Sequence, residues 1–176
     1  ASNVTGNSSA ITIKAKSIPS GTVLLETLHI VQCPGSSHLE IDRYLPPSIL
    51  RSLITPSLQN IADQVPFNEF TDTAENITPE IFNQIIESQG SEVRNMLLKA
   101  KTESDAYLTT RKIDAEKETR RILDEEITRL KYLMKINPTV RTEELEYLQT
   151  TKLNALDAVK NATMRLEATR LIVVVP

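Results

Sequence analysis

The longest stretch without a helix-breaking residue covers residues 92–136, which contain neither glycine nor proline. Alanine, leucine, glutamate, lysine and arginine dominate it, so intrinsic propensity and charge pairs four residues apart both favour an α-helix. At ~1.5 Å per residue this helix would be ~65 to 70 Å long, more than a globular domain requires. Upstream, Thr78 and Pro79 are typical of a helix start, and Gly90 would kink or end that first helix.

A second helix is predicted after Pro138, which prevents a straight continuation of the first. Thr142, Glu143 and Glu144 resemble a helix start, with a hydroxyl cap followed by two acids at the positive end of the helix dipole. Apolar residues at three- and four-residue spacing continue to about residue 170. We expect this helix to lie antiparallel to residues 113–136.

Strands are predicted on both sides of the helices. Residues 22–32 are rich in β-branched side chains, and a Pro-Gly pair would turn them back into residues 38–44 as a hairpin. Residues 49–54 are too few to separate a strand from one or two helical turns by their period, but the prolines that bracket them favour a short strand. Residues 171–175 are all apolar and mostly β-branched, which is typical of a strand that lies between other strands of a sheet.

Together these elements predict an α+β fold. It would combine a small antiparallel β-sheet, a long antiparallel helical hairpin of coiled-coil type, and a C-terminal strand that returns to the sheet. We expect residues 1–9 to be a disordered lead-in or an artificial boundary, and residues 10–176 to form a single domain. In that domain, residues 10–70 and 171–175 would form a mainly β base, and residues 78–170 a helical arm.

Composition limits the function. The net charge is -3 and the isoelectric point about 5.5, so the chain lacks the basic excess that phosphate-backbone binding uses. We therefore do not expect the chain itself to bind nucleic acid. A single cysteine permits no internal disulfide and suits a reducing cytoplasm. No apolar run approaches the ~20 residues that span a bilayer, so we expect a cytoplasmic protein without a membrane partner.

Three sequence features go beyond periodicity. They are the double proline in RYLPPSILRSLI (43–54), the motif INPTVR (136–141) before an acidic helix start, and the closing RLEATRLIVV (165–174). The segment IADQVPF (61–67) follows the first of them. With these features, most of the chain from about residue 22 onward resembles the C-terminal part of the RapA family, also called HepA. These are bacterial RNA polymerase-associated ATPases of the Swi/Snf helicase-like superfamily.

The resemblance implies a larger parent protein that uses ATP and Mg²⁺ to act on RNA polymerase and to recycle it after transcription. The sequence itself has no G-x-x-x-x-G-K-[ST] phosphate loop and no acidic motor box. No catalytic residue of the family can therefore be carried over, and we expect no enzymatic activity and no cofactor in this part of the chain.

Candidate site residues are few. His29, Cys33 and His38 flank a turn, but their spacing fits no familiar zinc pattern, so we assign no catalytic, cofactor-binding or metal-binding residue. The carboxylates at 124–126 and 143–146 alternate with basic residues and are typical of solvated helix surfaces.

The remaining candidate is the end of the helical hairpin, where basic charge gathers at four polar positions: Lys131, Lys135, Asn137 and Arg141. The first two could simply complement the negative end of the helix dipole. The alternative is contact with an acidic partner.

The sequence thus predicts a non-catalytic structural or docking arm of a RapA-like ATPase, directed toward RNA polymerase or neighbouring domains of the parent chain. The other prediction that we keep open is a free-standing coiled-coil adaptor or oligomerisation module, in which residues 111–121 meet another chain. The sequence does not indicate the oligomeric state.

Overall fold

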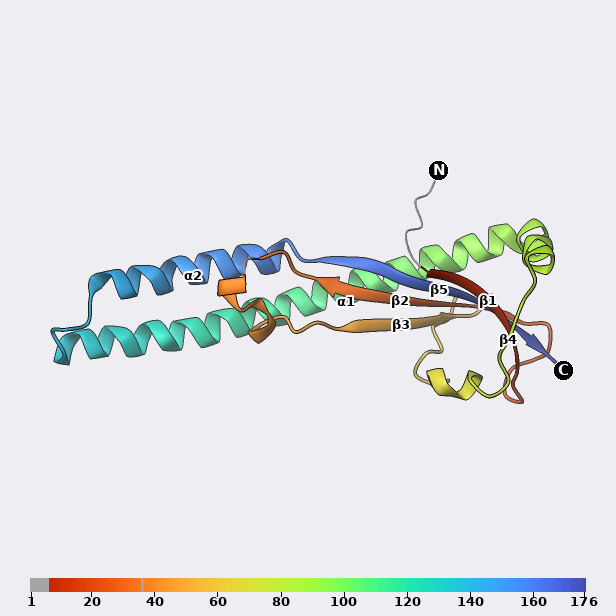
Figure 1. The fold of residues 1–176 in the computed structure, drawn as a ribbon, viewed down its shortest axis with the longest axis horizontal. Helices are drawn as coiled ribbons and strands as arrows, with labels where there is room; N and C mark the ends of the chain where they lie inside the picture. The colour runs from red at the N-terminus through yellow and green to blue at the C-terminus, as the bar shows by residue number, and fades with distance from the viewer. Residues whose placement is uncertain (1–6, 36) are drawn as a thin grey trace. The chain divides into compact units, whose positions relative to one another are not determined.

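The computed structural model describes residues 7–35 and 37–176 (Figure 1). Its helices and strands, in chain order, are β1 (Asn7–Lys14), β2 (Val23–Gln32), β3 (Ile49–Ile54), β4 (Glu75–Asn76), α1 (Pro79–Ile136), α2 (Thr142–Lys160) and β5 (Thr163–Val175). Short 3-10 helices lie at Ser37–Leu39, Ile41–Arg43 and Phe67–Phe70.

The chain divides into two compact units. Unit 1 takes in the chain up to Ile30 together with Ile49–Ala106 and Met164–Pro176, so it contains the sheet and the first half of α1. Unit 2 consists of Val31–Ser48 and Tyr107–Thr163, which include the second half of α1 and all of α2.

The sheet of unit 1 has five strands in the order β3-β2-β5-β1-β4. β2 pairs with β3, and β1 with β4, in antiparallel directions, whereas β1 and β5 run parallel from Asn7↔Ala168 to Lys14↔Val175. The predicted α+β class is confirmed, as is the return of the C-terminal strand, which lies between β2 and β1. Because one pair is parallel, the sheet is mixed and not purely antiparallel.

Both faces of this sheet carry apolar clusters. On one face, Leu25 of β2 and Ile54 of β3 pack with Met96 and Ala100 of α1. On the opposite face, a second cluster joins the strands to the segment between β3 and β4; its buried members are Ile11, Ile13, Leu24, Leu53, Val65, Phe70, Ile172 and Val174. Part of the sheet is therefore a middle layer between α1 and an irregular segment.

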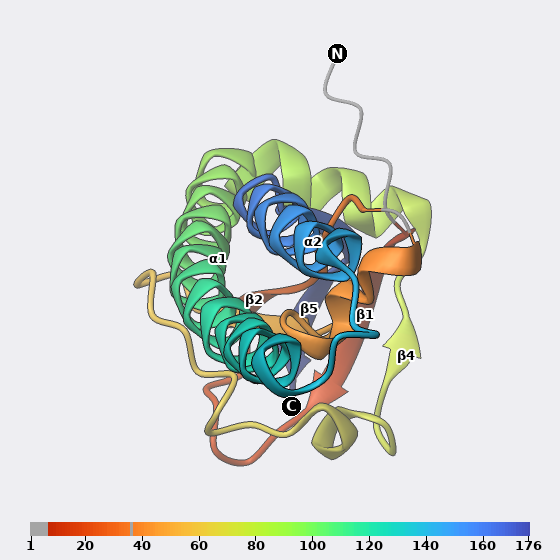
Figure 2. The ribbon, with the colours of Figure 1, turned by 90° about the vertical axis from the view of Figure 1, so that its left-hand side faces the viewer.

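Unit 2 is built on a pair of helices. Figures 1 and 2 both show α2 beside the second half of α1, with the two joined through residues 137–141. Lys152 of α2 pairs with Asp124 of α1 at 2.5 Å, and the Lys112 ammonium donates to the Lys160 carbonyl at 2.9 Å. Since a later residue of α1 meets an earlier residue of α2, the helices are antiparallel, as predicted.

The interface of this helix pair contains small residues. Ala115 of α1 is buried, and so is Ala155 of α2. Thr119 is fully buried as well, and its hydroxyl donates to the Ala115 carbonyl at 2.7 Å, which satisfies it inside the helix. Small side chains at these positions let the two backbones approach closely.

The start and the kink of α1 agree with the sequence. The helix begins at Pro79, and the Ile81 amide lies 3.5 Å from the Thr78 hydroxyl oxygen. Gln89, next to Gly90, has non-helical dihedral angles (φ -128°, ψ 18°), so the helix is kinked there without ending. α2 starts at Thr142, but its N-cap residue is Arg141, so the expected hydroxyl cap at Thr142 is wrong by one position.

The predicted hairpin of residues 22–32 with residues 38–44 is wrong. β2 pairs instead with β3, from Leu25↔Ile54 to Ile30↔Ile49, and the second segment forms two 3-10 helices. Glu40 between them has φ 50°, a left-handed conformation that interrupts any strand. The buried side chains of this segment are Leu39, Ile41, Tyr44 and Leu45, so they face the interior together instead of alternating.

The expected helix over residues 142–170 is wrong in its last part. α2 ends at Lys160 and β5 begins at Thr163, so residues 163–170 belong to the sheet and not to a helical arm. The predicted lead-in at residues 1–9 is wrong for residues 7–9, which pair with β5, and its remainder lies outside the described residues. That residues 10–176 form one domain stays a prediction.

Candidate functional site

The candidate contact surface is the tip of the helix pair in unit 2, where residues 137–141 join α1 to α2. The Asn137 side-chain oxygen accepts hydrogen bonds from the Thr139 amide at 3.0 Å and from its hydroxyl at 2.7 Å. The backbone amide of Asn137 also donates to the backbone carbonyl of Leu133 at 2.8 Å. Asn137 therefore shapes the turn, because an asparagine side chain can close such a turn on its own backbone.

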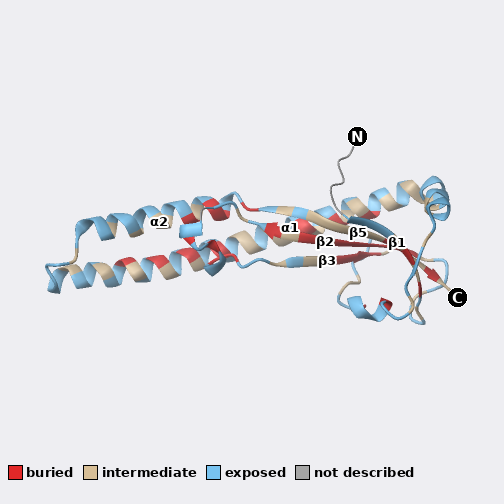
Figure 3. Ribbon diagram, viewed as in Figure 1, coloured by how far each residue is buried: buried red, intermediate tan, exposed pale blue. Residues whose placement is uncertain are grey.

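The basic residues predicted at the tip are all exposed (Figure 3). Within the described residues no ion pair engages Lys131, Lys135 or Arg141. The tip is not uniformly positive, however. Arg141 shares the lining of a groove of about 690 Å³ with Glu143 and Glu144, so negative charge lies at the tip as well. The two lysines, which lie on the last turns of α1, are the basic residues best placed to attract an acidic surface.

Large apolar side chains at the tip were missed by sequence reasoning. Tyr132 and Ile136 on α1 are each 62% exposed, and Tyr147 on α2 is 59% exposed. Leu133, which follows Tyr132 in the sequence, is 38% exposed. Tyrosine at the surface is typical of protein interfaces, because the ring contributes apolar area and the hydroxyl a hydrogen bond.

The sequence did contain a signal for these side chains. Buried Leu123 and Ile127 place the seam of α1 on one face, which Leu130 and Met134 continue. Tyr132 and Ile136, four residues apart, form a second apolar pair that points away from that seam. This pair is therefore available for contact with a partner other than α2.

His29 is buried and Cys33 is half-buried. Within the described ranges no group of three or more His, Cys, Asp and Glu residues is arranged to hold a metal ion. In unit 1, burial lowers the pKa of His29, and nearby Asp105 opposes this to a smaller degree. In unit 2, the Cys33 thiol donates to the Ala158 carbonyl at 3.1 Å, and burial raises its pKa.

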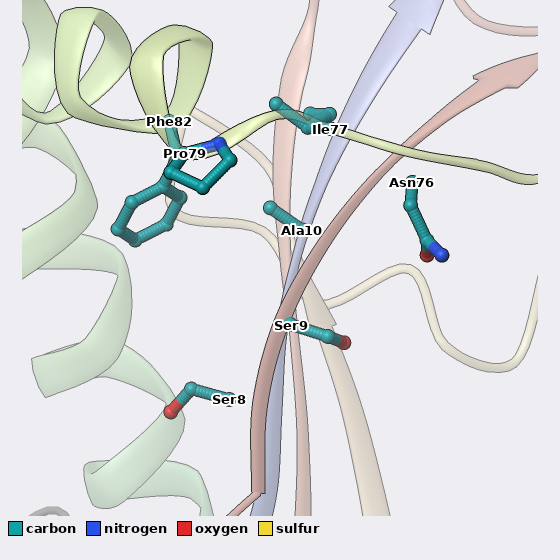
Figure 4. A pocket seen from close by; sticks show the side chains of 7 residues that line it. All are labelled: Ser8, Ser9, Ala10, Asn76, Ile77, Pro79 and Phe82. Atoms are coloured by element: carbon teal, nitrogen blue, oxygen red, sulfur yellow. The ribbon is translucent and has the colours of Figure 1, made fainter.

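A pocket of about 390 Å³ lies in unit 1 at the edge of β1 (Figure 4). Its lining is small or apolar apart from two serines and one asparagine: Ser8, Ser9, Ala10, Asn76, Ile77, Pro79 and Phe82. None of these side chains is a general acid or base, and the serines have no histidine beside them in the lining. The pocket could hold an apolar group but offers no catalytic arrangement.

The helices of the described part of the chain include none with the length and apolar character needed to cross a bilayer.

Comparison with known protein families assigns the chain to one of them. Residues 1–174 match the family described as "RNA polymerase recycling family C-terminal", and the chain therefore belongs to this family. Among its curated relatives are three RNA polymerase-associated RapA proteins. The one from Pseudomonas syringae is 32% identical over 96% of the chain, that from Proteus mirabilis 30% over 97%, and that from Pseudomonas fluorescens 34% over 96%.

The resemblance to RapA that the sequence motifs indicated is confirmed. The chain spans only 18% of the length of each of these relatives, so it corresponds to one part of a RapA protein.

Proposed function

We propose that this chain is the non-catalytic C-terminal arm of an ATP-dependent RNA polymerase recycling factor of the RapA type, working in the bacterial cytoplasm. ATP and Mg²⁺ would bind elsewhere in the longer protein. The arm would contact RNA polymerase or neighbouring domains and hold the motor in position, without bond chemistry of its own. The family match over residues 1–174 and the absence of a phosphate-binding loop from the sequence support this function.

The observation that carries the proposal is the composition of the tip. Tyr132 and Ile136 are each 62% exposed and directly follow the cationic Lys131 and Lys135 in the sequence, and Tyr147 of α2 is 59% exposed. Exposed aromatic anchors commonly supply most of the binding energy of an interface, while surrounding charges raise the association rate and select the partner. An acidic protein surface with apolar pockets fits this tip.

The test is binding of the chain to purified RNA polymerase core, measured by biolayer interferometry. Tyr132→Ala combined with Ile136→Ala should weaken Kd by ~30-fold or more, since each interface anchor is worth ~1 to 2 kcal/mol. Leu153→Ala is the matched control, because Leu153 is 67% exposed on the same helix pair but far along α2 from the tip. Equal Kd values for the tip variant and the control would contradict the proposal.

Charge is tested separately. Lys131→Glu with Lys135→Glu should lower the association rate and flatten its dependence on salt, whereas the same reversal at exposed Lys117 should have little effect. We also expect duplex DNA at physiological salt to bind the chain weakly, because the net charge is -3.

A second candidate function is self-association as a coiled-coil adaptor. A groove of about 600 Å³ runs between α1 and α2, with Leu156 in its lining and the side chains of Ile113 and Leu153 49% and 67% exposed. This groove coincides with the segment at 111–121 where the sequence suggested another chain. Light scattering measures the mass of the chain in solution and so tests this function. A monomer at every working concentration would exclude self-association.

A further inference from the structure

One face of the unit 1 sheet remains apolar beyond the residues that its cluster covers. Ile30 of β2 lies opposite Ile49 of β3, and alternation places Leu28 on the same face as Leu24. On β5, alternation from buried Ile172 places two further apolar residues on this face. We call the following residues the open face: Leu28, Ile30, Ile49, Leu166 and Ala168.

Exposure distinguishes this region from the rest of the sheet. Ile49 is 65% exposed and the other open-face residues are half-buried, whereas Leu24 and Leu53 on the same face are fully buried. Figure 3 shows the change along β3, from pale blue and tan near its start to red near its end. A sheet face that meets water normally carries polar side chains, so an apolar one indicates that something covers it.

Charged residues form the border of the open face. The buried Glu26 carboxylate lies 2.9 Å from the Arg51 Nε and 2.9 Å from the Arg170 Nη2. Arg51 is the register partner of Leu28, and Arg170 follows Ala168 on the same face of β5. Two guanidinium groups share one carboxylate, which leaves one positive charge in excess.

The hydrogen bonding of this border is incomplete. Within the described residues, the buried Arg51 Nη2 and Arg170 Nε have no acceptor. The ring of Phe67 stacks on Arg170, with 4.9 Å between the guanidinium carbon and the ring centroid, and this ring is itself 52% exposed. Buried donors normally have an acceptor, which either water or a further carboxylate can supply here.

We propose that the open face is a docking surface for another segment of the longer RapA-type chain. That segment would place apolar side chains on Ile30 and Ile49 and a carboxylate beside Arg51 and Arg170. This inference rests on the proposed function, in which the chain is one part of a longer protein.

Two observations favour an occupant from the same chain over a separate protein. The relatives are more than five times longer than this chain, since the chain covers 18% of them, so ample polypeptide is available nearby. A segment on the same chain also has an effective concentration of millimolar order. An apolar face with a charged border is typical of permanent interfaces, which are more hydrophobic than transient ones.

The experiment measures the reactivity of a thiol at position 49 toward N-ethylmaleimide. Ile49→Cys is introduced into the 176-residue chain and into the full-length protein, and labelling of the peptide that contains it is followed by mass spectrometry. We expect labelling to be at least 10-fold slower in the full-length protein. Ile81→Cys is the matched control, because Ile81 is 48% exposed in the same unit, and it should react equally in both.

A second variant tests the carboxylate. Arg170→Gln removes the excess charge but leaves Glu26 paired with Arg51, so unit 1 keeps its buried ion pair. In the full-length protein this variant should speed labelling at position 49 at least 3-fold, and an unchanged rate would overturn the acidic character of the occupant.

Equal labelling of Ile49→Cys in both chains would overturn the docking proposal itself. Protection that appears only when RNA polymerase core is added would also overturn it, in favour of an external partner. Neither result depends on the tip variants, whose binding to polymerase tests the proposed function independently.

Discussion

Removal of the Glu26 carboxylate should destabilise unit 1 strongly. Glu26 is 3% exposed, and its two oxygens lie 2.9 Å from nitrogens of Arg51 and Arg170. Without it, Arg51 still donates to the carbonyl groups of Ala62 and Val65, at 3.2 and 2.6 Å. Arg170 keeps only the Phe67 ring among these contacts, so its charge is left without a counter-ion.

Breaking a buried ion pair in this way costs up to ~3 to 5 kcal/mol, mainly because the remaining charge of Arg170 stays partly buried and unpaired. Glu26→Ala should therefore lower the urea midpoint of unit 1 by about 2 M, at a typical slope of ~2 kcal/mol per M. The double variant Glu26→Ala with Arg170→Met should recover a large part of this loss, since it removes the stranded charge. Arg170→Met alone should cost less than Glu26→Ala.

Hydrogen exchange of β2 and β3 peptides at increasing urea is the appropriate assay. The chain has no tryptophan, and the exchange of residues 23–30 of β2 and 49–54 of β3 reports on unit 1, to which these residues belong. Exposed Glu87 provides the control, because Glu87→Ala should change the free energy of unfolding by less than ~0.5 kcal/mol. A cost below ~1 kcal/mol for Glu26→Ala would refute the reasoning, and so would a double variant no more stable than Glu26→Ala.

Three further outcomes are expected. Burial lowers the pKa of His29 below 6.5, so the unfolded state binds the proton first as the pH falls. Urea titrations should therefore show unit 1 losing stability from pH ~6.5 down to the pKa of His29 in the folded state. A loss of equal size in the His29→Leu variant would contradict this. The raised pKa of Cys33 and its hydrogen bond to the Ala158 carbonyl should slow its reaction with Ellman's reagent at least 10-fold relative to the urea-unfolded chain. Equal reaction rates would contradict the raised pKa and the hydrogen bond. Ala155→Leu should destabilise the helix pair by ~1 to 3 kcal/mol in thermal melts followed by circular dichroism, because Ala155 is fully buried; if the melts match those of Leu153→Ala, the close packing is wrong.

The helix pair was predictable because its signals are local. The signals are a long run without glycine or proline, a proline at the turn, and two acids after Thr142. Each depends on residues that are close in the sequence. The strand at residues 49–54 was predictable for a similar reason, since prolines bracket it, and residues 171–175 were predictable as strand because they are all apolar and mostly β-branched.

The start of β5 was missed because two periods coexist there. Leu166 and Ala162 continue the three-and-four spacing of α2, but Met164, Leu166 and Ala168 also alternate with polar residues in the manner of a strand. Pairing with β1 and β2 decides between them, and that pairing joins residues more than a hundred positions apart. Tertiary context overrides local propensity in such cases.

The partner of β2 was missed for a related reason. In HLEIDRY, polar and apolar residues alternate after a Pro-Gly pair, which favours an immediate hairpin. In the structure, Glu40 has a left-handed conformation and Leu39 and Ile41 are both buried, so this segment forms two 3-10 helices and no strand. Of the candidate site, the sequence located the charged turn at the tip. It did not distinguish seam residues from exposed ones, because that requires knowing which face of α1 meets α2.

The position of β5 in the sheet has a consequence for synthesis on the ribosome. β5 lies between β1 and β2, yet it is the last strand of the chain to be translated. The helix pair of unit 2 relies on contacts between residues translated earlier, and helical hairpins form quickly. The sheet can be completed only after β5 leaves the exit tunnel, so until then β1 and β2 each lack a neighbour and are exposed to chaperones or to aggregation.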